Sequence, residues 1–172
     1  MNEEAEHWED LVWHMRRSIR YHMRRVRFYD LWHVWTNMIG IIFGSATALT
    51  ILGGLGPSYT VAASFVVSIA FMLDLFVGTA RMSRQHQGLA SKFIGLQAKA
   101  EVESDHQATI LHRYRAEILL IEHDEPPVLR MLNDICHNEM VIAMGYPSKY
   151  LIHIPWMKRH LANIISFDPI NV

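Results

Sequence analysis

Charged side chains are missing from the middle of this 172-residue chain, although Asp, Glu, Lys and Arg make up 19% of it. None of the four occurs between Asp30 and Asp74, a run of 43 residues. A soluble domain of this size rarely contains such a gap. A helix needs roughly 20 mostly apolar residues to cross a bilayer, so a run of this length with a turn in its middle predicts two membrane spans.

Other absences exclude several classes of protein. A single cysteine, Cys136, rules out an intramolecular disulfide framework and fits a reducing compartment. The 16 basic residues are balanced by 17 acidic ones, so we expect no nucleic-acid partner. The first 30 residues are too charged for a secretory signal. Because no nucleophile elbow, phosphate loop or dinucleotide fingerprint occurs, we expect neither enzymatic activity nor a cofactor.

The uncharged run divides at residues 53–58, a cluster of glycine, proline and serine typical of a turn. We therefore predict one span at about residues 32–52 and a second at about 59–77. The short turn makes the two helices an antiparallel hairpin. The alternative is a soluble four-helix bundle whose two central helices are buried on all sides.

The flanks of the run predict the orientation, because Lys and Arg close to a span stay on the cytoplasmic side. The basic residues are Arg16, Arg17, Arg20, Arg24, Arg25 and Arg27 before the first span, and Arg81, Arg84 and Lys92 after the second. Both termini should then be cytoplasmic, with only the turn outside. We expect most of these arginines to face solvent or lipid headgroups.

The rest of the chain predicts an all-α protein. Residues 1–30 form an amphipathic basic helix, residues 31–78 the transmembrane hairpin, and residues 79–172 a cytoplasmic helical tail. The tail begins with one long helix, residues 81–124, which pairs with the N-terminal helix and stops before Pro126 and Pro127. A shorter helix follows at residues 128–144. The segment from Pro155 either docks on the helical tail or lies at the membrane surface.

Small and polar residues form candidate sites within the spans. On the first span, Asn37, Gly40, Gly44 and Thr47 share one stripe with His33. Gly40 and Gly44 allow close helix packing, and the same stripe could instead line a pore in an oligomer. On the second span, Ser64 and Asp74 share a face.

Asp74 is the most informative of these residues, since a carboxylate within a span is costly and by default functional. Two interpretations remain open from the sequence. Asp74 forms a structural ion pair with Arg81 or with an arginine of the N-terminal helix, or it belongs to an ion pathway or gate.

Eleven histidines invite a metal interpretation. Glu103 with His106, and Asp134 with His137, have the i, i+3 spacing of di-metal carboxylate bundles. Such pairs arise often by chance in a histidine-rich chain, so we expect solvated or capping histidines and no metal site.

The order of elements resembles the SLATT families, two-span proteins of bacterial conflict systems. The likeness rests on Tyr21–Tyr29 entering the first span, on Leu73–Leu75 at the end of the second span and Ala80–Gly88 after it, and on Ile121–Pro127 and Cys136–Glu139 in the tail. It implies a pore-forming, membrane-disrupting effector of antiviral defence in the bacterial inner membrane. It also implies a homo-oligomer that is activated by a separate nucleotide-signalling or sensor protein.

Three functions stay open from the sequence. The first is the oligomeric, pore-forming effector with the lipid bilayer as its surroundings. The second is a non-conducting membrane scaffold or sensor that recruits a partner through its helical tail. The third is a soluble helical metal-binding bundle.

Overall fold

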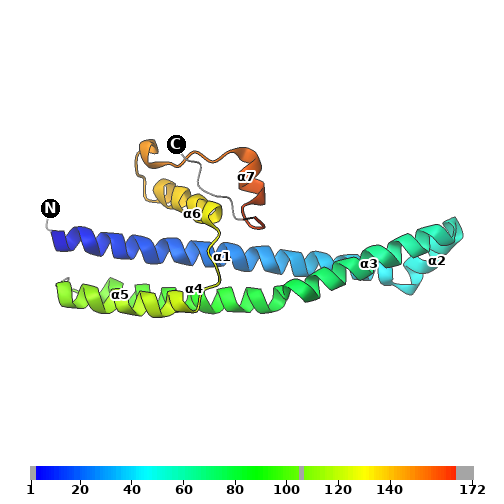
Figure 1. Cartoon of the computed structure of the whole chain (residues 1–172), viewed down its shortest axis with the longest axis horizontal. Helices are drawn as coiled ribbons and strands as arrows, with labels where there is room; N and C mark the ends of the chain where they lie inside the picture. The colour runs from blue at the N-terminus through cyan, green and yellow to red at the C-terminus, as the bar shows by residue number, and fades with distance from the viewer. Residues whose placement is uncertain (1–2, 105–106, 166–172) are drawn as a thin grey trace. The chain divides into compact units, whose positions relative to one another are not determined.

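A computed structural model describes residues 3–104 and 107–165, without the side chains of residues 3, 4, 46 and 47. The described residues form helices and loops with no β-strand, so the chain is all-α as predicted. The helices are α1 (Glu3–Gly44), α2 (Ala46–Leu55), α3 (Pro57–Val77), α4 (Thr79–Val102), α5 (Ala108–His123), α6 (Arg130–Ala143), a 3₁₀ turn η1 (Ser148–Tyr150) and α7 (Trp156–Leu161), all traced in Figure 1.

The chain divides into two compact units. Residues 26–85 form the first, which we call the hairpin. Residues 1–25 together with residues 86–172 form the second, which we call the helical module. The long helices α1 and α4 each contribute one part to either unit.

Breaks at three small residues divide the hairpin into helices. Ser45 separates α1 from α2, and its side chain accepts a hydrogen bond from the amide of Ala48 at 3.2 Å. Gly56 adopts a φ of 126°, and Pro57 then occupies the first turn of α3, where its lost N–H costs nothing. Gly78, in the left-handed conformation, separates α3 from α4. Because the chain turns at Gly56, α2 packs beside α3 (Figure 1).

The predicted first span, residues 32–52, is therefore not a single helix. It contains the end of α1, the break at Ser45 and most of α2. The cause is local, because the serine hydroxyl competes for a backbone amide and starts a new helix at Ala46. The predicted second span is one helix, and it begins two residues earlier than expected, at Pro57.

Apolar residues lie exposed along the hairpin. None of the 21 residues of α3, all within the described part, is buried. By length and composition, one helical run, Pro57–Val102, could cross a membrane. The pair Ala5–Gly44 and Ala48–Leu55 would add a second crossing only if this bent pair forms one broken span. The structure thus supports one of the two predicted spans.

Three helices form the first core of the helical module. Met15 of α1, Phe93 of α4 and Tyr114 of α5 are buried in one cluster with Trp8, Leu11, Leu96, Ala100, Leu111 and Ile118. The pairing of the N-terminal helix with the helix after the second span is as predicted. The single long helix over residues 81–124 is wrong, because the chain turns after Val102 and α5 begins at Ala108. The two halves of its apolar stripe can then pack with α1 in one core.

A second core joins α6 and the following segment to α1. Tyr21 of α1 packs with Leu132 and Cys136 of α6 and with Ala162 just after α7. The Tyr21 hydroxyl also accepts a hydrogen bond from the amide of Leu129, the residue that precedes α6, at 3.0 Å. This bond satisfies an amide at the start of α6. The segment from Pro155 therefore docks on the helical module through one of its faces.

Candidate functional site

Asp74, at the end of α3, forms a partly buried polar network inside the hairpin. Its Oδ2 lies 3.2 Å from Nδ1 of His33, and its Oδ1 accepts a hydrogen bond from the Thr79 hydroxyl. Thr79 is almost fully buried, and the Asp74 side chain is only 16% exposed. Asp74 thus lies against a histidine and a hydroxyl. The first of the two interpretations from the sequence names Arg81 or an arginine of the N-terminal helix as its partner. Spacing along α3 could not reveal His33, which lies 41 residues earlier.

Asp30, the charged residue that precedes the uncharged run, has a matching contact. Its Oδ1 accepts a hydrogen bond from the hydroxyl of Ser83, a buried residue of α4. Thr79 and Ser83 are four residues apart and therefore lie on one face of α4. Hydroxyl groups on one face of α4 thus donate hydrogen bonds to both carboxylates that border the uncharged run.

The small-residue stripe of the first span faces α3 at one of its glycines. A Cβ atom on Gly40 would lie 2.5 Å from Cζ of Phe71, so only glycine allows the ring this position. A Cβ atom on Gly44 would meet no described atom within 4 Å. Gly40 therefore serves helix packing within the hairpin, while Gly44 leaves open space.

The other predicted span residues lie apart from this contact. Asn37 is partly exposed, and Ser64 is exposed on α3, where its carbonyl accepts a hydrogen bond from the Ser68 hydroxyl at 2.8 Å. The side chain of Thr47 is outside the described residues. The structure brings His33 and Gly40 of the stripe to α3 and does not bring Ser64 to Asp74.

Most of the N-terminal arginines contact other residues of the helical module. Arg16 pairs with Glu101 at 2.8 Å, and Arg24 binds both carboxylate oxygens of Glu139. Arg25 is buried and donates to the backbone oxygen of Asn163. Arg17 lies 3.3 Å from Nδ1 of His14, and Arg20 donates to the sulfur of Met140. Arg27, Arg81 and Arg84 have exposed side chains.

Two histidines missed by the sequence analysis meet in the interior of the helical module. Nδ1 of His22 lies 2.9 Å from Nδ1 of His86, and Nε2 of His22 lies 3.0 Å from Oε1 of Glu125. Both histidines are 1% exposed. Burial, followed by the nearby His22 and Arg25, lowers the pKa of His86 to about 4. The signal was present in the sequence, since His86 continues the apolar stripe of Leu89 and Phe93 at helical spacing.

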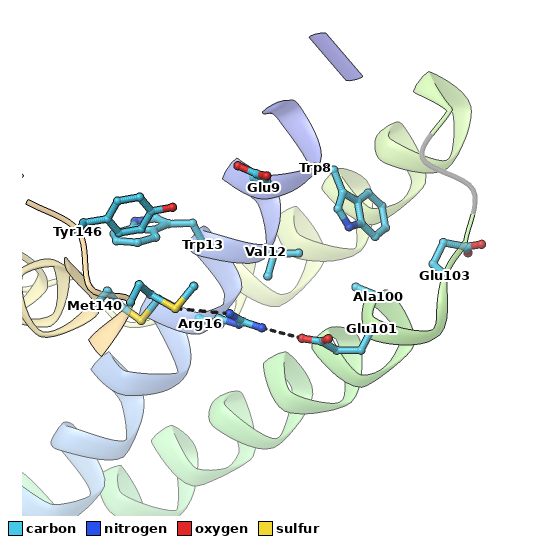
Figure 2. Close-up of a pocket in the computed structure, with 11 residues that line it drawn as sticks. Trp8, Glu9, Val12, Trp13, Arg16, Ala100, Glu101, Glu103, Met140 and Tyr146 are labelled. Carbon is cyan, nitrogen blue, oxygen red and sulfur yellow. Dashed lines mark hydrogen bonds and ion pairs between the residues drawn. The ribbon is translucent and has the colours of Figure 1, made fainter. Parts of the chain in front are cut away.

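A groove of about 460 Å³ opens where α1, the end of α4 and the end of α6 meet (Figure 2). Trp13 and Tyr146 form an edge-to-face pair in its wall, with ring centroids 5.6 Å apart. The Arg16–Glu101 ion pair also lines the groove, and Arg16 contacts the sulfur of Met144. Such a lining offers stacking and thioether contacts to a small flat molecule.

Of the two histidine–carboxylate pairs with metal-ligand spacing, the structure describes Asp134 with His137 completely, and only Glu103 of the other. His106 lies outside the described residues, and among those described no three His, Cys, Asp or Glu side chains converge as metal ligands. Burial raises the pKa of Asp134 above its usual value and that of the Cys136 thiol to about 12. Cys136 is therefore held as a neutral thiol inside the second core.

No protein-family model, curated protein or solved structure matches this chain. Its function must be argued from its own surfaces and contacts. Two features are unusual for a small helical protein. They are the apolar exposure of the hairpin and the network of Asp74 with His33 and Thr79.

Proposed function

We propose that the chain is an oligomeric effector of the bacterial inner membrane, whose paired spans assemble into a pore and disrupt the membrane. The observation that carries this proposal is the exposure of α3. Most of its side chains are apolar, and none of its residues, all described, is buried. Water would oppose such a surface, whereas lipid tails accept it on every side.

The length of α3 agrees with this environment. Its 21 residues span roughly 31 Å at 1.5 Å per residue, close to the hydrocarbon thickness of a bilayer. Phe65 is 67% exposed, Leu75 84% and Phe76 89%. These values argue against the soluble bundle, whose central helices would have to be covered.

In this proposal the bent pair α1–α2 supplies the second span and both termini face the cytoplasm. Arg27 before the run and Arg81 and Arg84 after it are exposed, which leaves them available to cytoplasmic headgroups. Assembly of several hairpins would bring the open space at Gly44 and the exposed Ser64 against neighbouring copies. The helical module would then control assembly, and a separate sensor protein would act on it, as the resemblance to the SLATT families implies.

Membrane potential in bacteria tests the pore. Induction of the protein should depolarise the cells when its genomic neighbours are present. Gly44→Ile, whose Cβ would meet no described atom within 4 Å, should weaken depolarisation if Gly44 contacts a second hairpin. An unchanged potential at high membrane abundance of the unaltered protein would contradict the pore.

A non-conducting scaffold or sensor is the second candidate, and the contacts inside the hairpin favour it. His33 and Gly40, which could have lined a pore, lie instead against Asp74 and Phe71. In this case Asp74→Asn and Asn37→Leu leave activity intact. Disruption of the first core, as by Phe93→Asp with Tyr114→Asp, abolishes it.

A further inference from the structure

Residues 140–165 of the helical module carry exposed apolar and basic side chains together and include no acidic residue. No Asp or Glu occurs between Glu139 and Asp168, while Lys149, Lys158 and Arg159 fall in this stretch. We call the exposed side chains of residues 142–165 the C-terminal face. Its net charge is positive although the whole chain has a formal net charge of -1.

One side of this segment is committed to the helical module. Ala162 is fully buried in the second core, and the backbone oxygen of Asn163 accepts a hydrogen bond from Arg25. α7 packs beside α6 in Figure 1. The segment is therefore held in place, and the orientation of its other side is fixed.

The other side exposes large apolar side chains. Trp156 is 72% exposed, Met157 59% and Ile164 61%. Ile142 of α6, Leu151 and Ile152 line a neighbouring groove of about 400 Å³. Arg159 lies in the same lining, as does Glu139, whose carboxylate is paired with Arg24. Basic residues thus lie next to exposed apolar ones on α7 and beside the groove.

This combination matches one kind of partner. Tryptophan prefers the boundary between headgroups and acyl chains, long aliphatic side chains enter the outer hydrocarbon, and Lys and Arg bind anionic headgroups. A protein partner with the same charge complementarity would need an acidic apolar face. In a second copy of the chain, α5 is the surface that comes nearest to this, with apolar Leu119 and Leu120 beside Glu117 and Glu122. The exposed Arg113 and Arg115 on the same helix would repel the basic C-terminal face.

We infer that the C-terminal face binds the surface of an anionic phospholipid bilayer. Docking on the helical module and contact with the membrane are then properties of opposite sides of one segment. This inference rests on the proposed membrane location of the hairpin. It adds a second, peripheral attachment, which would couple the position of α6 and α7 to the charge of the membrane.

The test uses the full chain in vesicles, with a fluorophore attached to a single introduced cysteine. Met157→Cys reports on the C-terminal face, and brominated acyl chains quench a label that reaches the hydrocarbon. Leu120→Cys is the matched control, since Leu120 is also an exposed apolar residue, at 72% on α5 against 59% for Met157. Val66→Cys in α3 reports separately whether the hairpin is inserted.

We expect the label at position 157 to be quenched in vesicles rich in phosphatidylglycerol and to be several-fold less quenched in phosphatidylcholine alone. Lys149→Gln and Arg159→Gln should each weaken the association roughly fivefold, as expected for one basic residue near an anionic surface. The label at position 120 should stay unquenched in both lipids.

A failure of this inference can be told apart from a failure of the proposed function. If the label at position 66 is quenched while that at 157 is not, the hairpin is inserted and the inference is overturned. Equal quenching at 157 in the two lipids also overturns it, because charge then plays no part. Concentration-dependent pairing of two labels at 157, with no lipid quenching, would assign the face to a second copy of the chain. An unquenched label at 66 would instead contradict the proposed function.

Discussion

His22 and His86 face each other through their Nδ1 atoms, 2.9 Å apart, in the interior of the helical module. A hydrogen bond at this distance requires one nitrogen to donate and the other to accept. Only one of the two Nδ1 atoms can therefore carry a proton. The pair is compatible with a single charge, which Glu125 at 3.0 Å from the other nitrogen of His22 can balance.

Acidification should destabilise the helical module through His86. Its pKa is lowered to about 4 in the folded chain from 6.5, so the unfolded state binds the proton first. The stabilisation is complete above pH 6.5 and is lost as the pH falls toward 4, by roughly 3 kcal/mol at most. Thermal unfolding of the purified chain, followed by circular dichroism across this range, measures the loss.

Two variants make the pH measurement specific. His86→Asn keeps a donor close to Nδ1 of His22 but does not titrate, so it should flatten the profile. His123→Asn removes a histidine whose side chain is 86% exposed, and it should leave the profile unchanged. A profile that is equally steep in His86→Asn would show that another group is responsible.

A larger residue at Gly40 should displace the Phe71 ring, whereas one at Gly44 should meet open space. Gly40→Ile places its side chain against the Phe71 ring and should lower the stability of the hairpin by about 1 to 3 kcal/mol. Gly44→Ile, on the same face four residues later, should leave the stability of the monomer unchanged. Unfolding in detergent compares the two, and Phe71→Ala should restore part of the loss in Gly40→Ile.

The loss of stability on replacing Asp74 should depend on whether the new side chain still offers a hydrogen-bond acceptor. Asp74→Leu leaves the buried Thr79 hydroxyl without its acceptor, which costs about 1 to 3 kcal/mol. Asp74→Asn keeps an acceptor oxygen and should be less destabilising. Equal stability of the two variants, measured by thermal unfolding in detergent, would show that the network contributes nothing to the fold.

Cys136 should be unreactive in the folded chain. Its side chain is fully buried and its pKa is raised to about 12, so the thiolate that attacks disulfide reagents is almost absent at neutral pH. Colour development with an aromatic disulfide should appear only when denaturant is added. Ser91→Cys, on the exposed side of α4, supplies the positive control, and fast reaction of Cys136 itself would contradict the burial.

Turn-forming residues made much of the fold predictable. Pro57 starts α3, the prolines at 126 and 127 follow the end of α5, and Gly145, with a φ of 71°, lies just beyond the end of α6. These signals act within one turn of the chain, so they can be read from it directly. The break at Ser45 was missed because a serine within an apolar run is compatible with a continuing helix.

Contacts between distant segments were the part that local patterns could not predict. The arginines of α1 have the spacing of a solvated face, yet Arg16 and Arg24 meet carboxylates 85 and 115 residues later. His33 was recognised as part of a polar stripe, but its partner, Asp74, follows only from the fold of the hairpin. Periodicity identifies a face of a helix and does not identify what covers it.

The central claim, that the uncharged run forms a membrane hairpin with both ends on the same side, is tested most directly by labelling intact bacteria. A membrane-impermeant maleimide should label Ser58→Cys, at the turn, in intact cells. It should label Ser91→Cys, in α4, only after the membrane is permeabilised, while Cys136 stays unlabelled. The claim would be contradicted if the chain were recovered in the soluble fraction after alkaline extraction and neither introduced cysteine were labelled in intact cells, while both were labelled to the same extent after permeabilisation.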